Sequence, residues 1–221
     1  MTPLPALSLL ETRVLGVLVE KQHTVPDSYP LTLNALVSGA NQKTSRDPVI
    51  EATEAEVQAA VDRLKGLSLI VESSGGRVMR YAHNVGKVLS VPPQSVAVLA
   101  VLFLRGPQTA GELRINSDRL HRFGDILAVE GFLNELAERP AGALVKELPR
   151  QAGARENRWA HLLSGEPDVS AGAAASPAPP SEAVAASEIA ALKANVDRLQ
   201  AEVAELRETL ARVCKELGIT G

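Results

Sequence analysis

An internal repeat constrains the architecture of this chain more than any other feature of its sequence. Residues 14–18 read Val-Leu-Gly-Val-Leu, and residues 98–102 read Val-Leu-Ala-Val-Leu. A clearer match closes each copy, where Arg-Tyr-Ala-His at 80–83 corresponds to Arg-Trp-Ala-His at 158–161. Similar segments that recur in the same order indicate a duplicated structural unit. We therefore expect two copies of one module before the composition changes near residue 165.

The first module, residues 1–83, carries the start signals of two helices. Ser8 precedes Glu11 by three residues, and Thr53 precedes Glu56 by three, which is the spacing of a capping box. In this motif the hydroxyl and the carboxylate accept hydrogen bonds from backbone N–H groups that the start of a helix leaves free. Apolar residues at helical spacing follow each box, so each box predicts a helix.

A short second helix and a hairpin complete the first module. Residues 32–37 are predicted to be helical, with Gly39 ending the helix. The β-prone runs 69–71 and 78–81 flank a Ser-Ser-Gly-Gly turn at 73–76, which is typical of a β-hairpin. Three helices closed by a hairpin is the order of a winged helix-turn-helix module.

The second module, residues 84–164, repeats this order. A helix follows Pro92-Pro93, a capping box of Thr109 and Glu112 starts the next, and apolar residues mark the third, at Ile126, Val129, Leu133 and Leu136. Hairpin strands are expected at 143–145 and 158–161. The predicted fold class is α+β and mostly helical, with two tandem winged-helix modules, a disordered linker and a C-terminal coiled-coil helix.

The tail of the chain has a different character. Residues 165–187 are dominated by Ala, Pro, Ser and Gly, which predicts a flexible linker. In residues 188–218 the apolar positions alternate at spacings of three and four, which is the heptad pattern of a coiled coil. The pattern predicts a homodimer, and the reversed order of Leu210 and Val213 leaves a trimer open. The predicted self-association residues are Ile189, Leu192, Val196, Leu199, Val203, Leu206, Leu210, Val213 and Leu217. The alternative is an amphipathic helix that folds back on its own domain.

Composition and hydropathy indicate in which cellular compartment to expect the protein. The net charge of −3 excludes a strongly basic nucleic-acid coat and a polybasic membrane anchor. No apolar run approaches the roughly 18 residues of a membrane-spanning helix, and no basic stretch leads into an apolar one at the N-terminus. Cys214 is the single cysteine, which excludes an intrachain disulfide. We expect a cytoplasmic protein that does not contact a membrane.

Three segments resemble the bacterial YceH family. They are Asn-Gln-Lys-Thr-Ser-Arg-Asp-Pro-Val at 41–49, Gln-Thr-Ala-Gly-Glu-Leu-Arg at 108–114 and Arg-Glu-Asn-Arg-Trp-Ala-His-Leu at 155–162. The resemblance covers roughly residues 7–165, with one departure at Ala110, where the family pattern has proline. A first-turn helix position accepts either residue. The resemblance implies a tandem winged-helix fold, often with a C-terminal heptad segment, and it implies no established function.

The sequence predicts a protein that is not an enzyme and holds no cofactor or metal. The histidines at 23, 83, 121 and 161 have no metal-ligand spacing to one another or to Cys214. The chain contains no Walker loop, no dinucleotide-binding fingerprint and no nucleophile elbow. His83 and His161 end the two hairpins in equivalent places, which predicts a repeated structural role.

Charge patterning gives a mixed indication of DNA binding. Winged helices often place the third helix in the major groove, but both third helices here are rich in glutamate, as at Glu54 and Glu135. The basic residues lie instead in the turns before these helices and in the second hairpin. The candidate nucleic-acid contacts are Lys43, Arg46, Arg114, Arg119, Arg122, Lys146, Arg150 and Arg155. The alternative is that Arg46 with Asp47, and Arg114 with Glu112, form local ion pairs that fix tight turns.

Two functions therefore stay open. The first is a dimeric DNA-binding or transcription-associated protein, which binds double-stranded DNA with two protomers joined by the coiled coil. The second is a protein-interaction adaptor that presents acidic third helices or hairpins to a protein partner. We favour the first because duplication together with dimerisation suits an extended binding surface.

Overall fold

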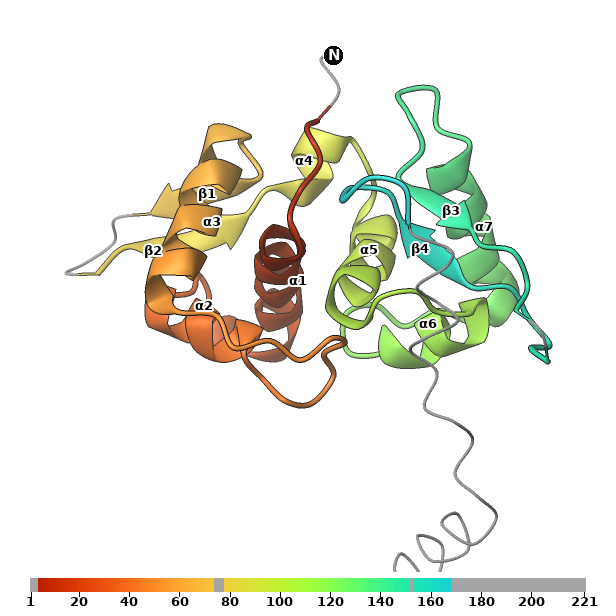
Figure 1. Cartoon of the computed structure of the whole chain (residues 1–221), viewed down its shortest axis with the longest axis horizontal. Helices are drawn as coiled ribbons and strands as arrows, with labels where there is room; N and C mark the ends of the chain where they lie inside the picture. Colours follow the sequence, from red (N-terminus) through yellow and green to blue (C-terminus); the bar gives the residue numbers. More distant parts are fainter. Residues whose placement is uncertain (1–3, 74–77, 152, 168–221) are drawn as a thin grey trace, which may run out of the picture. The chain divides into compact units, whose positions relative to one another are not determined.

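The computed structural model describes residues 4–73, 78–151 and 153–167. The predicted hairpin turn at Gly75-Gly76, most of the predicted linker and the whole predicted coiled-coil segment lie outside these residues. The described part is α+β, with seven α-helices and two antiparallel sheets of two strands each (Figure 1). None of its helices is long and apolar enough to cross a membrane.

Each half of the described chain has three helices followed by a hairpin. The first half contains α1 (Leu9–Thr24), a single 3₁₀ turn (Pro26–Ser28), α2 (Leu33–Ala40), α3 (Glu54–Gly66), β1 (Ile70–Ser73) and β2 (Arg80–His83). A short helix that no sequence pattern predicted, α4 (Val85–Leu89), joins the halves. The second half contains α5 (Pro93–Arg105), α6 (Ala110–Asn116), α7 (Ile126–Ala137), β3 (Val145–Glu147) and β4 (Trp159–His161).

The hairpins show that the duplication predicted from the sequence extends to backbone pairing. Tyr81 of β2 forms an isolated bridge with Leu31, and Trp159 of β4 forms one with Gln108. Leu31 and Gln108 each stand immediately before the residue that caps the second helix of their half. The same long-range pairing therefore occurs at the same place in both halves.

Local sequence signals predicted the helix starts correctly and one helix end incorrectly. The capping boxes at Ser8, Thr53 and Thr109 are all formed, with both hydrogen bonds present in each. Gly39, however, does not stop the second helix, because α2 runs through it to Ala40. A Cβ at Gly39 would lie 2.6 Å from Cγ1 of Val17, so the glycine allows α2 to approach α1.

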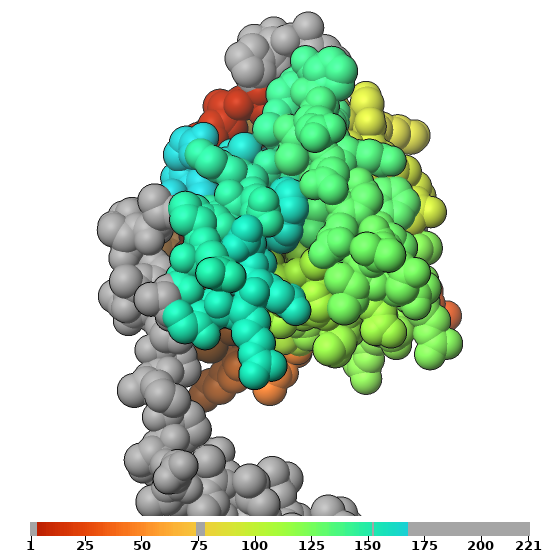
Figure 2. Space-filling view, turned by 90° about the vertical axis from the view of Figure 1, so that its right-hand side faces the viewer, coloured from red at the N-terminus to blue at the C-terminus, as the bar shows by residue number. Residues whose placement is uncertain are grey.

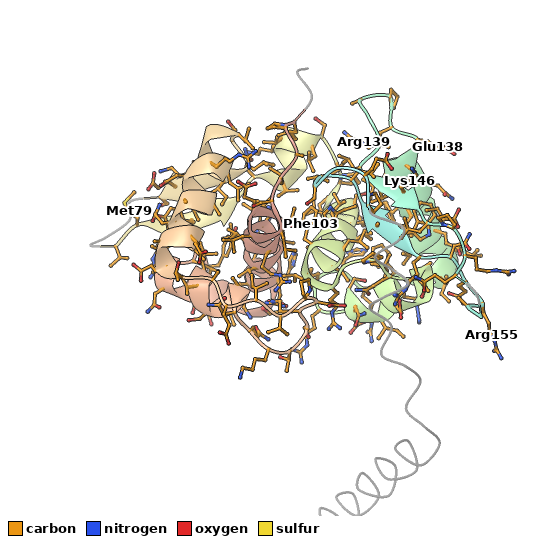
Figure 3. All side chains as sticks on the ribbon, in the orientation of Figure 1. Met79, Phe103, Glu138, Arg139, Lys146 and Arg155 are labelled. Atoms are coloured by element: carbon orange, nitrogen blue, oxygen red, sulfur yellow. The ribbon has the colours of Figure 1, made fainter. Side chains whose placement is uncertain are left out.

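The two halves pack against each other through their first helices. In Figure 1, α1 and α5 lie side by side at the centre, and the described residues belong to one compact unit. A Cβ at Gly16 of α1 would lie 2.8 Å from Cγ of Leu104 on α5, so the helices meet closely. Phe103, labelled between them in Figure 3, is buried in the same apolar core. One hydrophobic cluster spans both halves.

Candidate nucleic-acid interface

The structure divides the eight predicted contact residues by exposure. Arg46 is buried and Arg114 is partly buried. The other six side chains are exposed, namely Lys43, Arg119, Arg122, Lys146, Arg150 and Arg155. Only exposed cations can reach a phosphate without unfolding part of the protein, so the candidate interface is built from the second group.

Arg46 has a structural role, and its partner is not the one expected. Its guanidinium donates hydrogen bonds to both carboxylate oxygens of Glu20, at 3.1 and 2.7 Å, and to the backbone oxygen of Gly39 at 3.1 Å. The predicted local pair with Asp47 is therefore replaced by a pair between α1 and the loop after α2. Burial alone would raise the pKa of Glu20, but the hydrogen bonds and charge of Arg46, together with Lys21, hold it below its ordinary value.

A second buried arginine anchors the same loop. Arg13 is fully buried and donates to the backbone oxygens of Ala40 and Pro48, at 3.3 and 2.7 Å. Burial lowers the pKa of Arg13, and the nearby positive charge of Arg46 lowers it further. The two guanidinium groups thus bind backbone oxygens on both sides of the loop, at Gly39 and Ala40 before it and at Pro48 near its end, although the loop forms neither helix nor strand.

The loop 41–49 also reaches the second half of the molecule. The backbone N–H of Asp47 donates to the oxygen of Leu104 at 2.9 Å, and Arg105 donates to Oγ of Ser45 at 2.8 Å. The loop 41–49 therefore connects the first half to the second through hydrogen bonds to α5. Of the two predicted nucleic-acid contacts in this loop, Lys43 is exposed and Arg46 is buried.

The turn between α6 and α7 presents two arginines to solvent. Arg122 is 87% exposed and lies 3.3 Å from Asp118, which is itself 60% exposed, so solvent weakens this pair. Arg119 is exposed and makes no hydrogen bond or ion pair within the described residues. The guanidinium of Arg119 is therefore free to bind an anion, and that of Arg122 can exchange its weak, exposed pair with Asp118 for one.

The second hairpin contributes cations of two kinds. Arg150 and Arg155 lie in the loop between β3 and β4, and Figure 3 shows Arg155 extending outward from its tip. Lys146 forms an ion pair with Glu166 at 2.7 Å.

The predicted ion pair of Arg114 with Glu112 is not formed, because Glu112 pairs with Arg158 at 3.3 Å instead. Sequence spacing could not show that partner, which comes from the adjacent hairpin.

We call the five exposed cations without a strong partner the basic edge: Lys43, Arg119, Arg122, Arg150 and Arg155. The segments that carry them are the loop 41–49, the residues after α6 and the β3–β4 loop. All three reach the lower end of the compact unit in Figure 1, and Figure 2 shows the last two at that end from the side. The basic edge therefore draws on both halves of the molecule.

The third helices carry no free cation on their described surfaces. On α3 the exposed positions include Glu54, Glu56 and Asp62, and its basic residues Arg63 and Lys65 are paired with Glu11 and Glu72. The sequence of α7 contains no Lys or Arg. These helices match the expectation from sequence that they are acidic. Among the described residues, no group of His, Cys, Asp and Glu is placed to hold a metal ion.

The chain is similar to a family of proteins of unknown function. The model of that family, described as "Protein of unknown function, DUF480", matches residues 7–154. A UPF0502 protein of Dechloromonas aromatica is 60% identical over 212 residues, covering 96% of this chain and 98% of the relative. A UPF0502 protein of Methylibium petroleiphilum is 62% identical over 216 residues, covering 98% and 92%. The predicted membership of the YceH family is consistent with these matches, and the chain belongs to the DUF480 family of UPF0502 proteins.

Proposed function

We propose that this chain is a non-enzymatic protein of two winged-helix modules, and that it binds double-stranded DNA along the basic edge. The order of three helices and a hairpin in each half supports the modules. The observation that carries the DNA proposal is the basic edge itself. Its five cations are exposed, and the second half holds ten Lys and Arg against eight Asp and Glu.

The proposed contacts are to the phosphate backbone. Arg and Lys in loops bind phosphates well, and such contacts position a protein on DNA without reading its sequence. Base reading usually comes from a helix in the major groove, but α7 offers no Lys or Arg there. We therefore expect binding of mixed-sequence duplexes with little preference among them.

The proposal is tested by fluorescence anisotropy of a labelled, mixed-sequence duplex titrated with the full-length protein. Wild type is expected to bind at low salt and to weaken at physiological salt, because each neutralised phosphate releases counterions. Replacing both Arg119 and Arg122 with alanine is expected to weaken binding at least tenfold without lowering the melting temperature. The charge-matched control replaces Arg80 and Lys87, exposed cations outside the basic edge, and is expected to bind within about twofold of wild type. Absence of binding by wild type at low salt would overturn the proposal.

The proposal includes self-association through residues 188–218. Its support is the heptad pattern, in which Val196 and Val203 at one seam position alternate with Leu199 and Leu206 at the other. Sedimentation equilibrium is expected to give a dimer for the full chain and a monomer after replacement of Leu199 and Leu206 with aspartate. A full chain that is monomeric at micromolar concentration would contradict this part of the proposal.

A protein partner is the second candidate, favoured by exposed apolar side chains at the α6–α7 end. Ile115 is 71% exposed and Leu127 is 73% exposed, next to acidic helix surfaces. Exposed apolar side chains beside charged ones are typical of protein interfaces. A photo-crosslinking residue at position 127 should then give one discrete adduct in cells, and one at position 87 should give none. Absence of an adduct at 127 would remove this candidate.

A further inference from the structure

A pocket of about 500 Å³ opens between the two halves, away from the basic edge. The N-terminal segment 4–7 and the α4 residues Val88 and Leu89 line one side of it. The loop that follows α7, residues 139–144, and the segment 162–165 line the other side. Most of these side chains are leucine, valine or alanine, so the wall is largely apolar.

One charged residue stands in this wall. Arg139 is the single charged residue among the described residues that line the pocket. Its guanidinium donates to the backbone oxygens of Leu89 and Gly142, both of which also line the pocket. These contacts hold the guanidinium at the pocket wall, and Figure 3 shows Arg139 on the side where α4 and the α7 loop meet.

The guanidinium has capacity left for a ligand. An arginine side chain carries five N–H donors, and the contacts to Leu89 and Gly142 use two of them. No Asp or Glu of the described chain lies within ion-pair distance of Arg139. A positive charge without an acidic partner beside an apolar cavity favours an anion more strongly than the same charge would in open solvent.

We propose that this pocket binds a small amphipathic carboxylate, with an apolar body against the leucines and its carboxylate on Arg139. The pocket volume falls within the range of roughly 300–1,000 Å³ that is usual for small-molecule sites, which combine apolar walls with a few placed polar groups. The guanidinium fork matches a carboxylate in two parallel hydrogen bonds, and a single guanidinium neutralises a single negative charge. A ligand in this place contacts both halves of the molecule.

The experiment titrates the full-length protein with octanoate, octanol and octyl phosphate by isothermal calorimetry. Octanoate is expected to bind at least tenfold more tightly than octanol, whose hydroxyl carries no charge for Arg139. Octyl phosphate carries up to two charges and is expected to bind more weakly than octanoate. Equal affinity for octanoate and octanol, or no octanoate binding at millimolar concentration, would overturn the proposal.

Two variants separate the site from general effects on folding. Arg139→Leu is expected to weaken octanoate at least tenfold and to leave octanol unchanged. Ala143→Trp, which fills the pocket and keeps the arginine, is expected to abolish binding of both. The control Arg80→Leu removes an exposed arginine of β2, outside both the pocket and the basic edge, and is expected to bind octanoate as wild type does. If Arg139→Leu binds octanoate as tightly as wild type does, the ligand occupies another site and the proposal is overturned.

Discussion

At the scale of single residues, His83 and His161 occupy equivalent places in the two hairpins. His83 pairs with Ile70 across the first sheet, and His161 pairs with Val145 across the second. The Nδ1 atom of each is buried without a hydrogen bond, and the ring of His161 meets Phe103 edge-on at 5.0 Å. Burial lowers the pKa of both histidines to about 4, with His23 adding to the effect at His83. Both half-buried imidazoles are therefore neutral at neutral pH.

This pairing predicts a loss of stability in mild acid. Between pH 6.5 and pH 4 the unfolded chain binds protons at these histidines while the folded chain does not, so the free energy of unfolding falls as the pH falls. The slope reaches about 1.4 kcal/mol per pH unit for each histidine. His161→Leu removes one of the two groups and should flatten the dependence of the melting temperature on pH in this window. His121→Gln, which removes a histidine of the α6–α7 turn, serves as the control, and an unchanged slope in His161→Leu would contradict the assignment.

The ion pair of Arg46 and Glu20 gives a second prediction at this scale. Glu20→Ala leaves the fully buried guanidinium of Arg46 without its carboxylate. The expected loss is about 3 kcal/mol in the free energy of unfolding, measured by urea titration, because an unpaired buried charge is costly. Glu135→Ala, on an exposed helix surface, should change stability by less than about 0.5 kcal/mol. Similar small losses in both variants would show that the pair does not hold the loop 41–49.

At the scale of elements, local sequence signals predicted the helix starts and the hairpins, because capping boxes and β-prone runs act over three or four residues. They could not predict the loop 41–49, whose shape depends on Arg13 and Glu20 from a different helix. The candidate nucleic-acid interface was likewise predictable only in part. The exposed arginines of the α6–α7 turn were found from the sequence, whereas the burial of Arg46 depends on a carboxylate 26 residues away.

Two glycines in helices should respond oppositely to alanine. Gly39→Ala brings a methyl group to 2.6 Å from buried Val17, and the overpacking should cost about 1–3 kcal/mol in spite of the better helix propensity of alanine. Gly131→Ala lies on α7 with open space around it and should gain about 0.5–1 kcal/mol. Thermal unfolding of both variants measures the difference. A stabilising Gly39→Ala would show that the close approach of α2 to α1 does not need a glycine at this position.

At the scale of the whole molecule, neither half can bury its first helix alone. Every residue of α5 from Ser95 to Leu104 is buried, as is every residue of α1 from Glu11 to Val19. A helix that is buried on all sides needs packing partners on more than one face. Each half supplies one set of partners, and the first helix of the other half supplies the rest. The two halves are therefore expected to fold as one cooperative unit.

This dependence is tested by dissecting the chain. A fragment of residues 84–167 exposes the α1-facing surface of α5, and we expect it to aggregate or to unfold without a sharp thermal transition. Residues 1–167 should unfold in one sharp transition, followed by circular dichroism. A stable, cooperatively folded 84–167 fragment would show that the packing of α1 on α5 is not required.

The basic edge is also a property of the whole molecule, because it takes cations from both halves and the proposed DNA contact needs them together. The most direct test is the dependence of duplex affinity on salt concentration, measured for wild type and for the variant with alanine at Arg119 and Arg122. Each phosphate contact contributes about 0.9 to the slope of the logarithm of affinity against the logarithm of salt concentration. We expect a steep negative slope for wild type and one shallower by about 1.8 for the variant. Equal slopes for the two proteins would contradict it.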